Sequence, residues 1–341
     1  MVVISEELGC GTRNGLKNEN EKNEDSAALQ NWMLKQPHLP RVTSYDRFLR
    51  RFLYVCDGSL EKAKSVIEVY FTLRAAIPEL FDRRDPTSPE IQEVFNLTDM
   101  VPLPITTPEG YHVQLYRLAD TDASRMVITD WLKVFVMLLD MRIGDEDDCV
   151  RTKKRSEMIG DSEYDLSLFP KGCKLRYDTQ DIFCAGDIPL YDSKGITLSH
   201  LTKLAVPILK KFMTYVQEGH PVRLRGIHVM NAAPIVDKLL NILKPFMKNE
   251  MLNMIHFHAP GSTTLYKYVP KEILPVDYGG KIESVASLKG KLKRTIENRR
   301  AWFEETRYMR ADESKRQDSR SKEYTTELFG MEGSFRKLSI D

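Results

Sequence analysis

Three histidines next to predicted strands are the residues best placed to do chemistry. His256 and His258 lie two positions apart on a predicted strand over residues 254–257 and its edge, so both side chains point to the same face. Two imidazoles on one face could share a metal ion, but no third ligand follows at a metal-site spacing. Hydrogen-bonded histidines on a sheet face are therefore the favoured interpretation, and the same holds for His228 in the segment GIHVM.

The rest of the chain contains no catalytic constellation that we can identify. The glycines between residues 9 and 15 miss the dinucleotide-binding spacing by one position and follow no strand. No G-x-S-x-G nucleophile motif occurs. Asp187 and Asp192 flank a predicted strand, and we expect Asp192 to bond the backbone of the turn before Gly195. We therefore predict no catalytic residues, no metal and no cofactor.

Composition and charge narrow the class of protein. A chain of 341 residues suggests about two domains. Lys and Arg number 50 against 49 Asp and Glu, and a net charge of +1 argues against non-specific nucleic-acid binding. The five cysteines are scattered and form no CxxC pair, as in proteins of a reducing compartment. With no apolar stretch typical of a signal peptide or a membrane span, we expect a cytoplasmic protein.

Helical and strand patterns alternate along most of the chain. Three short helical patterns come first, and the run YHVQLYRL over residues 111–118 then predicts a strand. Further strands are expected over 188–191, 223–230 and 254–257, separated by helices over 126–141, 198–217 and 234–253, and a charged helix over 281–311. Strands that alternate with helices of this length imply a partly parallel sheet. The predicted organisation is a mobile tail (1–24), a helical module (25–84), a main domain (85–283) with an inserted loop (144–181), and a charged helix with a polar tail (284–341).

The helical pattern over residues 234–254 is unusually apolar. Pro245 lies inside it and should kink the helix. One interpretation is a helix packed on the core of the sheet. The other is a movable lid over an apolar cavity, since its Phe and Met side chains can adapt to a ligand as well as to a core. Periodicity does not separate the two.

Several motifs occur in the order and spacing of a known family. They are RFLRRFLYVCDGSLEKA, GDIPLYDSKGITLSH, RLRGIHVMNAAPIVDKLLNILKPFMKNEMLNMIHFH and LPVDYGG. Together they resemble the CRAL-TRIO lipid-binding domain family over roughly residues 25–285, with most likeness to its tocopherol- and retinaldehyde-binding members. The ending FGMEGSFRKLSID is similar to an insect-type branch of that family.

The resemblance implies an α/β fold in which a helical N-terminal module precedes a mostly parallel sheet that floors a hydrophobic pocket under a lid helix. It also implies binding and transfer of one small hydrophobic lipid, such as a tocopherol-, retinoid- or other isoprenoid-like molecule, without catalysis. Carried over position by position, the lipid-binding residues would be Trp131, Phe135, Tyr191, Leu198, Tyr215, Val222, Ile227, Ile235, Val236, Leu239, Leu243, Phe246 and Met247.

The resemblance further implies transient contact with a membrane surface, with phosphoinositide as a candidate partner. The basic residues for that contact would be Arg223, Arg225, Lys244 and Lys248. The family's full phosphate-binding cluster is incomplete, because Cys56, Ser65, Glu250 and Met254 stand where its members have basic residues. The positive stretch over 289–300 is either a solvated helix face or a second membrane contact.

Three other functions stay open at this point. The chain could be a lipid-sensing regulatory or scaffold module, a protein that exchanges phosphatidylinositol or another phospholipid, or an enzyme acting on a hydrophobic substrate. A transfer assay separates the first from a carrier, because a scaffold would bind lipid and move none. The missing nucleophile–base pair counts against the enzyme.

Overall fold

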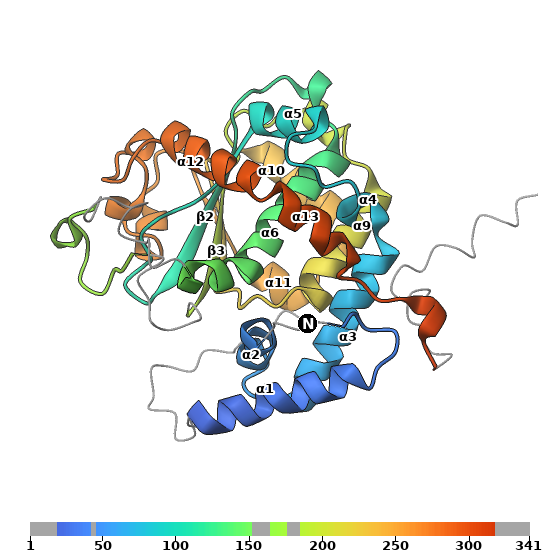
Figure 1. The fold of residues 1–341 in the computed structure, drawn as a ribbon. Coiled ribbons are helices and arrows are strands. Elements are labelled where there is room, and N and C mark those ends of the chain that lie inside the picture. The colour runs from blue at the N-terminus through green and yellow to red at the C-terminus, as the bar shows by residue number, and fades with distance from the viewer. Residues whose placement is uncertain (1–18, 42–45, 152–163, 176–184, 318–341) are drawn as a thin grey trace, which may run out of the picture.

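A computed structural model of the chain describes residues 19–41, 46–151, 164–175 and 185–317, and its centre is a five-stranded sheet (Figure 1). The strands lie in the order β1-β2-β3-β4-β5. β1 pairs antiparallel with β2, and the other three pairings are parallel, so the predicted mostly parallel α/β sheet is confirmed. The strands are β1 (Thr98–Pro102), β2 (Tyr111–Leu118), β3 (Gly186–Asp192), β4 (Ile227–Met230) and β5 (Ile255–His258).

The parallel strands follow one another in chain order, and this places their crossover helices together. Right-handed crossovers between successive neighbouring strands all pass over the same face of a sheet. The crossovers contain α6 (Ile128–Arg151), α9 (Val206–Thr214) and α10 (Pro234–Leu243), and Figure 1 shows all three on one side of β2 and β3. The other face packs against residues 265–288, in a core that includes Leu115, Leu190 and Ile273.

Helices before and after the sheet complete the molecule. The N-terminal layer consists of α1 (Glu19–Leu34), α2 (Asp46–Val55), α3 (Leu60–Ala76) and α4 (Pro78–Phe81), followed by α5 (Pro89–Leu97). It shares a hydrophobic core with α6 and α9. Because α1 begins at Glu19, residues 19–24 of the predicted tail are helical, and residues 1–18 lie outside the described part.

Prolines divide two of the predicted helices. The pattern over 198–217 forms α8 (Leu198–Leu201), α9 and a π-helical turn over Tyr215–Gly219, with Pro207 at the start of α9. The pattern over 234–253 forms α10, a 3-10 turn over Lys244–Phe246 and α11 (Asn249–Asn253). Pro245 in that turn explains the break, since its ring excludes a continuous helix.

Two further predicted segments begin or end at other residues in the structure. The charged helix over 281–311 consists of α12 (Val285–Asn298) and α13 (Arg300–Glu305). The inserted loop begins later than expected, because α6 continues to Arg151, and residues 152–163 and 176–181 of it lie outside the described part. None of the described helices is long and apolar enough to cross a membrane.

A buried charge cluster joins α6 to the N-terminal layer and to the C-terminal segment. Asp140 accepts hydrogen bonds from both Arg74 and Arg84, and all three side chains are almost fully buried. Arg74 also donates to the carbonyl of Met309 at 2.7 Å, and Arg84 donates to Thr306 at 3.0 Å. Burial opposes ionisation of Asp140, but the charges of the two arginines outweigh it and hold the pKa of Asp140 below its usual range.

Neutralising this carboxylate should strongly destabilise the protein. Asp140→Asn leaves two buried guanidinium groups without a counter-charge, and we expect the free energy of unfolding to fall by about 3–5 kcal/mol. Urea denaturation followed by circular dichroism measures the change. The control is Glu304→Gln, which removes an exposed ion pair with Arg307 and should cost less than about 1 kcal/mol. Equal losses in the two variants would contradict the role given to Asp140.

Candidate functional site

A cavity of about 420 Å³ lies between the sheet and its crossover helices. That volume falls in the range of about 300–1,000 Å³ that is usual for small-molecule sites. Most of the side chains that line it are apolar, and the lining includes residues of all five strands and of α6, α9 and α10. The site is thus a mainly apolar cavity inside the fold.

Alternation along the strands forms the floor of the cavity. Successive side chains of a strand point to opposite faces, so one face of the sheet collects every second residue. We call this the cavity face. Its members are in register across the strands: Gln114 pairs with Pro189, Tyr116 with Tyr191, Tyr191 with Val229, and Val229 with Phe257.

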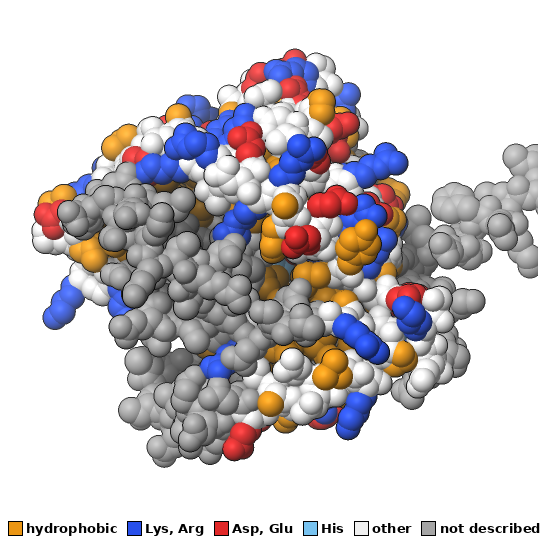
Figure 2. All heavy atoms as spheres, in the orientation of Figure 1, with side chains coloured by type: hydrophobic (Ala, Val, Ile, Leu, Met, Phe, Trp, Pro, Cys, Tyr) orange, Lys and Arg blue, Asp and Glu red, His pale blue; other side chains and the backbone are white. Residues whose placement is uncertain are grey.

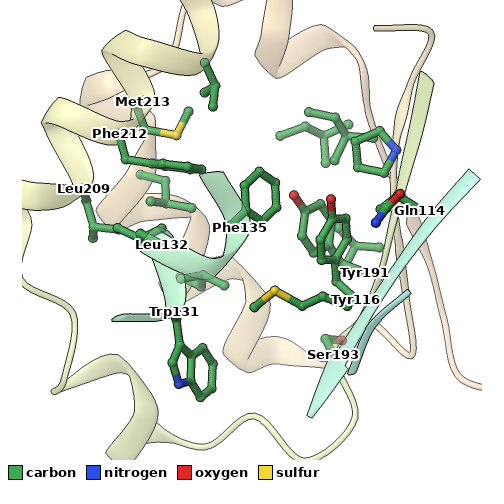
Figure 3. A pocket seen from close by; sticks show the side chains of 18 of the residues that line it. Gln114, Tyr116, Trp131, Leu132, Phe135, Tyr191, Ser193, Leu209, Phe212 and Met213 are labelled. Carbon is green, nitrogen blue, oxygen red and sulfur yellow. The ribbon is translucent and has the colours of Figure 1, made fainter. Parts of the chain in front are cut away.

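Stacked aromatic rings connect this floor to the helices above it. The ring of Tyr116 stacks on Tyr191 at 4.9 Å and on Phe135 of α6 at 5.0 Å. Phe135 in turn meets Phe212 of α9 edge-on at 5.3 Å. Figure 3 shows the two tyrosine rings next to each other, with Phe135 on their helix side. Bulky rings at these positions hold α6 and α9 away from the sheet.

The helix α10, which we call the lid helix, closes the cavity without filling it. Val236 is its only buried residue. Leu239, Leu240 and Leu243 line the cavity and stay half-buried. A helix packed on a solid core would bury these leucines, so the arrangement favours the lid interpretation over the packed-core alternative.

Most of the predicted lipid-binding residues line the cavity. These are Trp131, Phe135, Tyr191, Val222, Ile227, Val236, Leu239, Leu243 and Met247. Their contact with a lipid stays a prediction.

Four predicted residues lie elsewhere. Leu198 is 58% exposed on α8. Tyr215 is fully buried, with its ring against Tyr70 and Phe81 in the core shared with the N-terminal layer. Ile235 and Phe246 are half-buried outside the lining, and Phe246 packs in a small cluster with Met213, because the chain turns after Pro245.

Sequence reasoning missed much of the lining. The missed residues include Met100, Gln114, Tyr116, Leu132, Leu209, Phe212 and Met213. The signal for two of them was present in the strand over residues 111–118, where Gln114 and Tyr116 share a face with His112 and Leu118. The β1 residues had no such signal, because the sequence TDMVP does not alternate between apolar and polar residues and ends at a proline.

Three of the four residues predicted to contact a phosphoinositide already have partners within the protein, and the fourth is exposed. Arg223 is 7% exposed, donates to Asp57 at 2.7 Å and lies over the ring of Tyr54. Arg225 donates to the carbonyl of Ala185 at 3.0 Å. Lys248 forms an ion pair with Glu218, and Lys244 is exposed on the 3-10 turn after the lid helix.

The other positions named for this contact carry no charge suited to phosphate. Cys56 is buried, and burial raises the pKa of its thiol to about 11. Ser65 donates to the carbonyl of Glu61 at 3.1 Å. Glu250 is exposed and Met254 is half-buried.

The positive stretch over 289–300 is largely neutralised. Ion pairs join Lys289 to Asp99, Lys291 to Glu283 and Arg300 to Asp85, at 2.8, 2.8 and 2.6 Å. Basic and acidic side chains are interspersed over the part of the surface where α12 and α13 lie (Figure 2). These contacts favour the solvated helix face over a second membrane contact.

The rings of the three histidines stack on the sheet face opposite the cavity, and His228 and His258 are hydrogen-bonded to each other. His228 Nδ1 and His258 Nε2 are 3.0 Å apart, and His258 Nδ1 bonds the Thr264 hydroxyl at 2.8 Å. The His256 ring stacks on His228 at 4.9 Å, and Tyr268 covers both. No group of side chains suited to a metal ion occurs among the described residues.

Comparison with known proteins agrees with this arrangement. Residues 184–280 match the family described as CRAL/TRIO domain, and residues 18–91 match the family described as Pinta-like, UBA domain. The resemblance of the sequence to the CRAL-TRIO domain family is thereby confirmed. Proteins of this family bind lipophilic molecules and transfer them. The insect-type branch stays a prediction.

Relatives in this family are moderately similar to the chain. The alpha-tocopherol transfer protein-like protein of Mus musculus is 26% identical over 278 residues, which cover 81% of this chain and 71% of that protein. Clavesin-2 of Rattus norvegicus is 22% identical over 266 residues, which cover 77% and 70%. Among solved structures, the crystal structure of Sfh5 is similar, with a TM-score of 0.45 and 12% identity over 80% of this chain and 92% of that one.

The histidine stack gives a prediction about pH. Burial, together with the neighbouring His256 and His258, lowers the pKa of His228 to about 3, so we expect its ring to stay neutral down to about pH 4. The unfolded chain takes up this proton near pH 6.5. The unfolding free energy should therefore fall as the pH drops from about 6.5 towards 3, by up to about 1.4 kcal/mol per pH unit from this residue. NMR titration of the imidazole nitrogens measures the pKa, and a midpoint between pH 6 and 7 would contradict the burial argument.

Proposed function

We propose that this protein is a carrier that holds one lipophilic molecule in its cavity and moves it between membranes. The observation that carries the proposal is the apolar hollow of about 420 Å³ beneath a lid helix whose leucines stay half-buried. A relative whose name describes a tocopherol transfer protein supports it. The cargo we propose is a tocopherol-, retinoid- or other isoprenoid-like lipid.

The proposed carrier works in the cytoplasm and touches membranes transiently. Arg223 and Arg225 already donate to acceptors within the protein. Lys248 also has a partner, Glu218, so we assign the membrane contact to the lid helix and to Lys244 in the turn that follows it, rather than to a phosphoinositide cluster. We also propose that the helical module ends at residue 84 and that the lipid-binding domain ends at residue 283.

A carrier of this kind competes with the bilayer rather than with water. Moving a lipid of about 25 carbons out of water would yield about 20 kcal/mol at about 0.8 kcal/mol per methylene. A bilayer offers the lipid the same apolar surroundings, so exchange between membrane and cavity is close to thermoneutral. The rate at which the cavity opens then decides how fast cargo moves.

A buried glutamine fixes the end of the lid. The Gln217 side chain is 3% exposed and lies in the π-helical turn after α9. Its Nε2 donates to the carbonyl of Phe246 at 2.8 Å and to that of Met213 at 2.9 Å, and its Oε1 accepts from the backbone N–H of Lys248 at 2.7 Å. One amide thus holds both sides of Met247, where the chain leaves the lid helix. An opening lid must break these bonds.

Filling the cavity should abolish lipid binding. Val229→Trp places an indole on the cavity face at the centre of the site, and we expect lipid affinity to fall at least about tenfold by steric exclusion. The matched control is Val206→Trp on α9, where the valine is 44% exposed and does not line the cavity. Native mass spectrometry of co-purified lipid and a fluorescent-lipid transfer assay between liposomes measure the effect. Undiminished binding in the Val229 variant would contradict the assigned site, and lipid binding without transfer in the unmodified protein would favour the scaffold alternative.

Removing the Gln217 amide should speed release of cargo. Gln217→Leu breaks its bonds to Phe246 and Lys248, and at about 0.5–1.5 kcal/mol each we expect release to accelerate about 5- to 100-fold. Stopped-flow dequenching of a fluorescent lipid measures the rate.

The control for this variant is Gln92→Leu. Gln92 also makes two side-chain bonds, to Pro86 and Glu297, but these lie away from the lid. An unchanged release rate in the Gln217 variant would show that the hydrogen bonds of Gln217 do not limit the opening of the cavity.

A further inference from the structure

One polar side chain lies on the cavity face without a partner. Gln114 on β2 is 6% exposed, and its Oε1 is buried and has no hydrogen-bond partner. Figure 3 shows its amide beside Tyr116 and Tyr191, on the same side of the cavity. We propose that the Gln114 amide selects the cargo, and that the cargo is a neutral lipid with an O–H or N–H group; this inference rests on the proposed carrier function.

The fold does not need an amide at this position. The register partners of Gln114 in β1 and β3 are Pro102 and Pro189, so the sheet positions this residue through its backbone and not through its side chain. A buried amide with no partner lowers stability compared with an apolar side chain of the same shape. A bound molecule that pairs with the amide removes that penalty, and one that cannot pair leaves it in place.

The lining disfavours a charged polar group on the cargo. Its described arginines are Arg117 and Arg142, and each is already in an ion pair, with Asp99 at 2.7 Å and with Asp187. An ionised carboxylate or phosphate would lie in an apolar cavity without a free cation, which is costly. The polar group that meets Gln114 is therefore uncharged.

The unpaired atom also limits the kind of neutral group. Oε1 accepts hydrogen bonds, so it needs a donor. A hydroxyl group supplies that donor. An ether or ester oxygen can only accept, so it leaves Oε1 unpaired, as a hydrocarbon does. We expect an alcohol or phenol to bind more tightly than an ether, an ester or a hydrocarbon of the same skeleton.

The test compares three probes on one skeleton: phytol, phytyl methyl ether and phytane. Each displaces a fluorescent lipid from the full-length chain, after bound lipid has been removed by exchange into excess vesicles. The variants are Gln114→Met, which keeps the shape of the side chain, and Gln92→Leu as the control. We expect the unmodified protein and the control to prefer phytol to its ether by about ten- to a hundredfold, and Gln114→Met to lose most of that preference while it binds phytane at least as well.

A second measurement does not depend on the probe. The lipid-free Gln114→Met variant should unfold at a higher urea concentration than the unmodified protein, because an unpaired buried amide has been removed. A lower midpoint would show that the amide has a partner in the empty fold and would overturn the proposal, as would an unchanged preference for phytol. Equal binding of all three probes by the unmodified protein overturns the role of Gln114 alone, whereas failure of every lipophile to bind overturns the carrier function as well.

Discussion

The order of the strands along the chain is the constraint on which the cavity depends. Because β2 to β5 are neighbours in sequence order and run parallel, right-handed crossovers send α6, α9 and α10 to the same face of the sheet. Three helices on one face need a layer of side chains to separate them from the strands. Here that layer is the stack of Tyr116, Tyr191 and Phe135, which spans the gap at one place and leaves the rest open. The opposite face packs against residues 265–288 and against Phe169 from the connection before β3.

The family motifs mainly hold this frame together. Asp192 accepts a hydrogen bond from the Tyr278 hydroxyl at 2.8 Å, one from Asn231 Nδ2 at 2.7 Å and one from the backbone N–H of Lys194 at 2.9 Å. One carboxylate thus joins the end of β3, the end of β4 and the segment that covers the far face. Asn231 adopts a positive φ of 54°, which asparagine tolerates better than most residues. Motif residues can therefore identify a family through structural roles alone.

The sequence predicted the frame better than the site. Alternation and apolar runs located four of the strands, whereas the β1 sequence TDMVP shows neither pattern and ends at a proline. Proline chemistry explains the break after the lid helix, which the sequence anticipated at Pro245. Tyr215 was misplaced because an aromatic residue on an amphipathic helix can face either neighbour, and here it faces the N-terminal layer. Gln114 was overlooked because only the pairing of strands shows which face of β2 meets an empty space.

Affinity, selectivity and rate come from different parts of this cavity. An apolar wall distinguishes two lipids only weakly, since one methylene changes the binding free energy by about 1–3 kcal/mol. The bilayer that competes for the two lipids also solvates both of them equally well. In the proposal above, the buried amide of Gln114 distinguishes them by chemistry, because its unpaired Oε1 penalises every guest that lacks a donor. The lid helix contributes little to affinity or selectivity, since its leucines contact any apolar molecule in the cavity. In the proposed carrier, the bonds of Gln217 to the segment after the lid helix set the barrier between closed and open states instead. Substitutions on the floor of the cavity can therefore change which cargo binds, and substitutions near the lid can change how fast it is released, each independently of the other.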